Sequence, residues 1–158
     1  MTNSLYLSDV ILLLTAAVLF YAALNDLKHF TIRNELILLL VILFLIHSFI
    51  SGRWTSLLWT LGFVFSMFLI MLFFYSRNLM GGGDVKLLTV ALMWVGIDCA
   101  LAFSVLLLLF ALLHTVATKL HWVSGHKLDD GRARIPFAPS IAAALIGTFM
   151  LGCLQPVR

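Results

Sequence analysis

A run of glycines followed by an acid, Gly81-Gly82-Gly83-Asp84, is the feature of this chain that most directly suggests chemistry. The run separates two hydrophobic stretches whose composition belongs in a lipid bilayer. An ionisable side chain at or near membrane depth is costly, so a carboxylate there points to a functional role. A second acid, Asp26, ends another apolar stretch and is expected at the same membrane face. Two carboxylates that can meet at one face indicate acid/base chemistry on a membrane-embedded substrate.

Two converging aspartates, Asp26 and Asp84, fit aspartyl hydrolysis. One carboxylate, in its ionised form, takes a proton from water, and the other, protonated, polarises the scissile carbonyl. Because two close carboxylates do not both ionise readily, the pair holds one proton, and a low local dielectric strengthens this coupling. This chemistry requires no metal, no cofactor and no nucleophilic serine or cysteine.

Both aspartates also have a purely structural interpretation. Asp26 could be an interfacial anchor paired with Lys28, and Asp84 could cap a helix that begins at Val85. A cap needs no glycine run, whereas the close approach of another backbone does, so the run favours a site. Helix termini and solvated turns account for the other acids, which are Asp9, Glu35, Asp98, Asp129 and Asp130.

The histidines and cysteines form no recognisable site. No pair of histidines has the HExxH spacing of a zinc protease, and His47 and His114 are expected to be packed helix residues. Cys99 and Cys153 lie far apart in apolar stretches, and the chain has no CxxC pair. We therefore interpret both cysteines as small buried hydrophobic residues.

The composition is that of an integral membrane protein, with residues 1–158 forming a single transmembrane domain. The chain is 63% hydrophobic and 11% charged, and its mean hydropathy is +1.11. A soluble domain of this length carries roughly twice that charged fraction. The net charge of +3 comes from basic residues scattered among short loops. Without a basic arm or an aromatic-interleaved patch, nucleic acid is excluded as a partner, and membrane lipid is expected around the helices.

Apolar stretches predict an all-α fold with six transmembrane helices, since a helix crosses the hydrocarbon core with about 20 residues. Residues 85–118 are apolar almost throughout, but one helix of that length would measure about 51 Å, too long for one crossing. Residues 96–98 divide it into a short fourth helix and a long fifth. The first stretch lacks the cationic segment of a cleavable signal, so we expect it to be retained. The expected helices are 5–24, 36–50, 57–75, 85–95, 99–118 and 136–154.

The distribution of basic residues predicts the orientation. With six helices, the first, third and fifth loops share one side, and they hold eight of the ten Lys and Arg. This bias puts those loops in the cytoplasm and the N-terminus outside, with Asp26 and Asp84 on the cytoplasmic side. The eight residues are Lys28, Arg33, Arg77, Lys86, Lys119, Lys127, Arg132 and Arg134.

Three segments together resemble motifs of the type IV prepilin peptidases, in the order in which that family has them. Residues 81–88, GGGDVKLL, are similar to the GxGD signature, with Lys86 two residues after the aspartate. Residues 25–34 resemble the first aspartate segment, although Arg33 stands where the family usually has proline. Residues 134–139, RIPFAP, resemble the motif before the last helix.

This resemblance implies a GxGD-type membrane aspartyl peptidase in which Asp26 and Asp84 are the catalytic pair. It implies removal of a short basic leader from a prepilin or pseudopilin, at the cytoplasmic side of the bacterial inner membrane. The glycines at 81–83 would let the substrate backbone approach. Lys86 would position or tune Asp84, or would serve only as an interfacial anchor.

The chain is similar to the short, peptidase-only members found with tight-adherence (Flp-type) pilus systems. Larger members carry a cysteine-bearing cytoplasmic insertion linked to N-methylation of the mature pilin. Here there is no CxxC pair, and few residues lie outside the expected helices. Methyltransfer is therefore not expected.

The residues also leave two other functions open. Intramembrane acids mark ion pathways as well as active sites, so Asp26 and Asp84 could bind protons or cations in a small transporter or channel. The chain could alternatively be a non-catalytic subunit of a pilus or secretion machine. Cleavage of a leader-bearing prepilin separates the first function from both alternatives.

Overall fold

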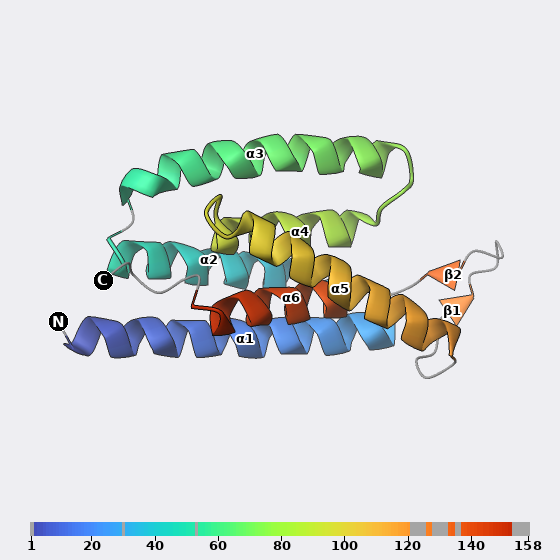
Figure 1. Ribbon diagram of the computed structural model, residues 1–158, viewed down its shortest axis with the longest axis horizontal. Helices are drawn as coiled ribbons and strands as arrows, with labels where there is room; N and C mark the ends of the chain where they lie inside the picture. Colours follow the sequence, from blue (N-terminus) through green and yellow to red (C-terminus); the bar gives the residue numbers. More distant parts are fainter. Residues whose placement is uncertain are drawn as a thin grey trace.

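The computed structural model describes residues 2–29, 31–52, 54–120, 126–127, 133–134 and 137–152. Within these residues the chain forms six helices and one short antiparallel hairpin (Figure 1). All six expected helices are present, with a short fourth one of 14 residues, whereas the hairpin was not predicted. The elements are α1 (Thr2–His29), α2 (Asn34–Ile50), α3 (Trp54–Ser76), α4 (Gly82–Val95), α5 (Ala100–Lys119), β1 (His126–Lys127), β2 (Ala133–Arg134) and α6 (Ala138–Met150).

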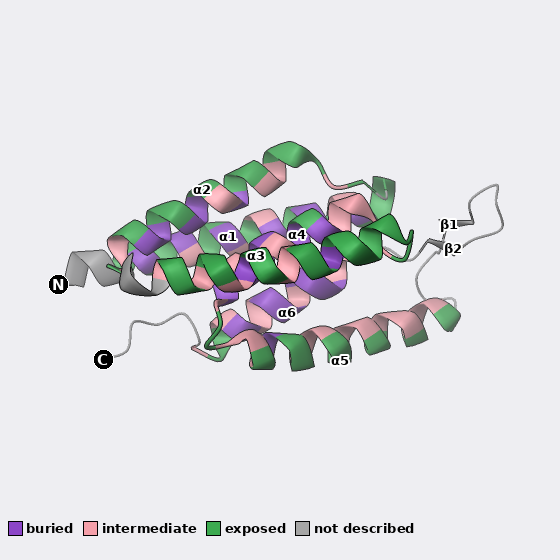
Figure 2. Ribbon diagram, turned by 90° about the horizontal axis from the view of Figure 1, so that it is seen from above, coloured by how far each residue is buried: buried purple, intermediate pink, exposed green. Residues whose placement is uncertain are grey.

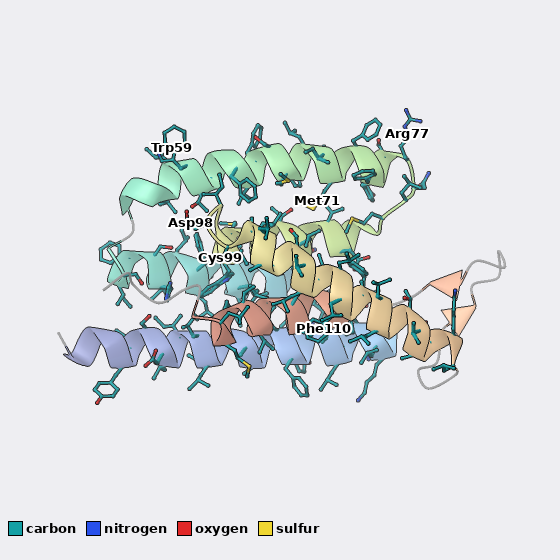
Figure 3. The ribbon with its side chains drawn as sticks, in the orientation of Figure 1. Trp59, Met71, Arg77, Asp98, Cys99 and Phe110 are labelled. Atoms are coloured by element: carbon teal, nitrogen blue, oxygen red, sulfur yellow. The ribbon has the colours of Figure 1, made fainter. Side chains whose placement is uncertain are left out.

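The short helices α4 and α6 lie at the centre of the bundle. α6 packs against α1, α4 and α5, and α4 packs against α2, α3 and α6. Buried residues gather on these inner helices, whereas α3 and α5 expose long outer faces (Figure 2). On α3, Trp59 points away from the bundle and Met71 lies on the side of α4 (Figure 3). Small residues along α6, such as Ala138, Ala142 and Ala144, let neighbouring helices approach closely.

The lengths and compositions of the helices are those of a membrane protein. Three segments are long and apolar enough to cross a bilayer, namely Tyr6–His29, Leu57–Ser76 and Ala100–Lys119. α2 and α6 are shorter apolar helices. The exposed faces of α3 and α5 carry large apolar side chains, among them Leu58, Trp59, Leu101 and Leu108.

Several helix ends differ from the sequence-based expectation, and two of these differences concern the aspartates. α1 continues to His29 instead of ending at residue 24, so Asp26 lies in the last turns of a helix and not in the following loop. Asn25 donates a hydrogen bond from Nδ2 to the carbonyl of Thr31, at 2.9 Å, which ties the helix end to the chain that follows. The expected end of α1 was set where the apolar residues stop. A helix can continue beyond its apolar stretch, which explains why the predicted end is too early.

α4 begins at Gly82, three residues before the expected start. Gly81 occupies its N-cap position with an extended backbone, and Asp84 lies in the first turn. α6 begins at Ala138, with Pro139 in its first turn, whereas Pro136, which was expected there, lies outside the described residues. The N-terminal ends of both central helices therefore lie within the segments that the motifs identified.

A buried polar contact joins α1 to α2 far from the aspartates. Ser8 lies inside α1, with its Oγ 3.0 Å from Nε2 of His47. His47 is 2% exposed and packs against the ring of Trp94, with 5.4 Å between centroids. The indole Nε1 of Trp94 donates to the carbonyl of Leu40 at 3.2 Å. The expectation that His47 is a packed helix residue is confirmed.

The interpretation of Cys99 as a simple buried hydrophobic residue is wrong, because this cysteine is disulfide-bonded. It occupies the N-cap position of α5, in the turn that follows α4 and away from the hairpin (Figure 3). The other cysteine of the chain, Cys153, lies outside the described residues. Disulfide formation depends on two Cα atoms coming within about 4.4–6.8 Å, a tertiary property that sequence spacing does not reveal.

Candidate active site

Asp26 is a buried carboxylate held by the start of the last helix. Its side chain is 5% exposed, and its Oδ2 accepts a hydrogen bond from the backbone N–H of Ala138 at 3.2 Å. Ala138 is the first residue of α6. The first N–H groups of a helix have no partner within the helix, and the helix dipole is positive there, so a carboxylate is stabilised at this position.

Asp84 is half-buried in the first turn of α4, and its position explains the glycine that precedes the helix. A β-carbon added at Gly81 would lie 2.9 Å from Oδ2 of Asp84, closer than real β-carbons approach other atoms. The carboxylate thus lies against the Gly81 backbone, over the N-terminal end of α4. A negative charge there also stabilises the helix start, so a structural and a chemical role coincide at Asp84.

Side chains from other parts of the protein pack closely against Gly82 and Gly83. A β-carbon at Gly82 would lie 3.2 Å from the ring of Tyr75, and one at Gly83 would lie 3.4 Å from Cβ of Ile32. Ile32 belongs to the short connection between α1 and α2. Close packing within the protein therefore accounts for these glycines, and the approach of a substrate backbone to them stays a prediction.

The contacts bring the three motif segments together at one end of the molecule. Ile32 packs near Gly83, and Nζ of Lys86 donates to Oδ1 of Asn34 at 2.9 Å. The C-terminal end of α1 and the N-terminal ends of α4 and α6 all lie toward the hairpin (Figure 1). Since the hydrogen bond from Lys86 goes to Asn34, an effect of Lys86 on Asp84 stays a prediction.

Asp26 and Asp84 lie at the same end of the molecule, but their helices, α1 and α4, are not direct packing neighbours. No Cα atom of α1 lies within 8 Å of a Cα atom of α4 in the described chain. Instead, α2 and α6 each pack against both helices. The Cα atoms of Asp26 and Asp84 are therefore more than 8 Å apart, and the sharing of one proton between their carboxyl groups stays a prediction.

Sequence reasoning missed His114 and Ser140, which meet at the first turn of α6, where the Asp26 carboxylate is also bound. Nδ1 of His114, on α5, is 3.3 Å from Oγ of Ser140, in the first turn of α6. His114 is half-buried and interacts electrostatically with the Asp26 carboxylate. The one available signal was an ionisable residue near the end of an apolar stretch, the same rule that singled out the aspartates.

The part of the chain that the structure describes contains no group of three or more His, Cys, Asp or Glu side chains placed to hold a metal ion. Among the described residues, the groups at this end that can do chemistry include the carboxylates of Asp26 and Asp84, the imidazole of His114, the hydroxyl of Ser140 and the N–H groups that begin α4 and α6. Such a set can transfer protons and polarise a carbonyl.

Comparison with known proteins assigns this arrangement to a family. The sequence model of the type IV leader peptidase family matches residues 13–119, which is more than half of the chain. The matched interval contains both Asp26 and Asp84 and ends with α5. No curated protein and no solved structure matches the chain. On the family match, with the motif segments gathered at one end of a helical membrane protein, this chain belongs to the type IV leader peptidase family.

Proposed function

We propose that this protein is a membrane aspartyl endopeptidase that removes a short basic leader from prepilin-like proteins, with Asp26 and Asp84 as the catalytic pair. Family membership identifies a peptidase with a prepilin-like substrate. The observation that carries the finer proposal is the meeting of the aspartate segments at one end of the bundle, through Ile32 against Gly83 and Lys86 with Asn34.

In the proposed reaction the pair works with one proton. The ionised carboxylate takes a proton from water, and the resulting hydroxide adds to the carbonyl carbon of the scissile peptide. The protonated carboxyl donates its hydrogen to the carbonyl oxygen as that oxygen becomes an alcohol. When the tetrahedral intermediate collapses, one of its hydroxyl groups returns a proton to the carboxylate that had donated one, and the carbonyl reforms. The C–N bond breaks as the leaving nitrogen takes the proton that the other carboxyl had accepted from water. The pair ends the cycle with one proton, as it began.

The lengths of the central helices support a site below the membrane surface. α4 has 14 residues and α6 has 13 described residues, which at 1.5 Å per residue correspond to about 21 Å and about 20 Å. The hydrocarbon core is about 30 Å thick, so neither helix fills it. The N-terminal ends that carry Asp84 and contact Asp26 can thus lie within the bilayer, where water is scarce and electrostatic interactions are strong.

Two features support a cytoplasmic position for this end. Seven of the ten Lys and Arg are described, and they belong to the last turns of α1 and α5, the turn after α3, the starts of α2 and α4, and the hairpin. These parts of the elements lie toward the hairpin, on the side of the aspartates (Figure 1), which fits the positive-inside rule for a cytoplasmic face. Cys99, at the far end of α4, is disulfide-bonded, which fits an oxidising compartment outside the cytoplasm. The seven residues are Lys28, Arg33, Arg77, Lys86, Lys119, Lys127 and Arg134.

A cleavage assay in lipid tests the proposal. The purified protein is mixed with a prepilin that carries its leader, and the mature product is followed on a gel. Wild type should cleave, and Asp26→Asn and Asp84→Asn should each abolish cleavage. Asp98→Asn is the matched control, because Asp98 is exposed in the turn between α4 and α5 and should be dispensable. If both variants of the pair still cut, the assignment of the pair is wrong.

The same preparation separates the alternatives. Wild type that cuts no prepilin but moves protons or cations across liposomes would be a transporter that uses its buried acids as ion ligands. Wild type that does neither, but binds components of a pilus machine, would be an assembly subunit. Cleavage that depends on both aspartates excludes both alternatives.

A further inference from the structure

The first turn of α6 holds two different side chains at once. The N–H of Ala138 binds Asp26, and two residues later Oγ of Ser140 contacts His114. Asp26 comes from α1 and His114 from α5, so the start of α6 joins them. We refer to Asp26, His114, Ala138 and Ser140 as the α6 cluster.

His114 differs in its surroundings from the other histidine that contacts a serine. His47 is almost fully buried against the Trp94 ring, as expected of a packing residue. His114 is only half-buried and interacts electrostatically with a buried carboxylate. An imidazole in the electrostatic field of a carboxylate can donate a hydrogen bond or carry a positive charge, and neither ability is needed for packing alone.

We propose that His114 is a positioning residue for the reaction at Asp26, with Ser140 fixing the orientation of its imidazole. The N–H of Ala138 holds the carboxylate, and the hydroxyl of Ser140, two residues further along the same helical turn, holds the imidazole of His114. This inference rests on the proposed function, since it assigns His114 to the peptidase reaction. A carboxylate that must accept a proton from water has to keep its orientation, because small misplacements of a reacting group cost large factors in rate.

Steady-state cleavage of a prepilin tests the role of His114. His114→Ala should lower kcat roughly 10- to 100-fold and leave KM nearly unchanged, because a residue that only positions Asp26 makes no contact with the substrate. His114→Gln keeps a polar group opposite Ser140 and should recover part of the loss. Ser140→Ala should lower kcat less, and its effect should not add to that of His114→Ala because the two residues act as a unit. His29→Gln, an exposed histidine three residues after Asp26, should keep the kcat of wild type.

A second readout does not depend on peptidase activity. The imidazole ¹⁵N resonances of His114, assigned by their loss in His114→Gln, are recorded in lipid nanodiscs. They should move in Asp26→Asn and in Ser140→Ala, and stay in place in Asp98→Asn.

Negative results would distinguish an incorrect role for His114 from an incorrect proposed function. The positioning role would be overturned, even if the protein is a peptidase, if both His114 variants keep the kcat of wild type. It would also be overturned if the His114 resonances do not move in Asp26→Asn. A wild type that cleaves no prepilin would overturn the proposed function, and the resonances would then still report whether His114 senses Asp26.

Discussion

The N–H of Ala138 donates to the Asp26 carboxylate over 3.2 Å, although 112 residues separate them in the chain. The bond connects the end of α1 to the start of α6, and α6 lies beyond the interval that matches the family model. The last helix therefore completes the surroundings of an aspartate that the first helix supplies. Asp26 reaches this environment only when both ends of the chain are folded together.

The first prediction concerns the stability that this hydrogen bond provides. Asp26→Asn keeps an acceptor oxygen of the same shape opposite the N–H of Ala138, so it should fold like wild type while losing activity. Asp26→Ala leaves that N–H without its partner in a buried place, which should lower the free energy of unfolding by about 1–3 kcal/mol. Denaturant titration in detergent micelles, followed by circular dichroism, measures the difference. Equal stability of the Ala and Asn variants would contradict a structural role for the bond.

The second prediction separates the glycines before Asp84. Gly81 has a φ of −73°, which any residue adopts, but a β-carbon there would meet Oδ2 of Asp84 at 2.9 Å. Gly81→Ala should therefore displace the carboxylate and lower kcat roughly 10-fold or more, with the fold intact. Gly83→Ala brings its β-carbon to 3.4 Å from Ile32, close to ordinary contact, and should lose much less activity.

Gly62→Ala is the matched control for these variants. Gly62 lies in α3 with nothing within 4 Å of an added β-carbon. The substitution should stabilise the helix by about 0.5–1 kcal/mol and leave cleavage unchanged. Full activity in Gly81→Ala would mean that the Asp84 carboxylate does not react from its position against Gly81.

The third prediction concerns Arg33, which stands where the family usually has proline. Its φ of −69° is a value that proline adopts, so the backbone keeps the shape that proline would impose. Arg33→Pro should fold and cleave normally. A gain of about 0.4–1 kcal/mol from a less flexible unfolded chain would be offset by loss of the exposed Arg33–Glu35 ion pair, which is worth at most about 1 kcal/mol. Thermal unfolding and a cleavage assay check the stability and the activity, and inactivity of a folded variant would show that proline does not fit at position 33.

A feature of the site could be predicted from the sequence when it depends on neighbouring residues in the chain, and not when it depends on how distant segments pack. Asp26 and Asp84 stand out because charge inside apolar sequence is visible locally, and the helices follow from stretches of apolar residues. The contact of His114 with Ser140 depends on how α5 packs against α6, which no local pattern encodes. The same holds for the disulfide at Cys99 and for the true end of α1, where a polar segment continues as helix beyond the apolar stretch.

The fourth prediction uses Cys99 to test the orientation. Because this cysteine is disulfide-bonded, a maleimide reagent should not label it in membranes until a reductant is added. After reduction, a membrane-impermeant maleimide should reach it from the periplasmic side only. Cys99→Ser should lower the free energy of unfolding by about 2–4 kcal/mol, the usual contribution of a disulfide. Labelling from the cytoplasmic side alone would invert the proposed topology.

The fifth prediction is the pH dependence of cleavage by a one-proton pair. When both carboxyl groups are protonated, no base remains to accept a proton from water, and when both are ionised, no acid remains to polarise the carbonyl. A plot of kcat/KM against pH should therefore fall on the acidic side and on the alkaline side of a single maximum. Asp98→Asn, which changes an exposed acid at the far end of α4, should keep both limbs. If kcat/KM does not fall on the acidic side, or does not fall on the alkaline side, then Asp26 and Asp84 do not divide the roles of acid and base between them.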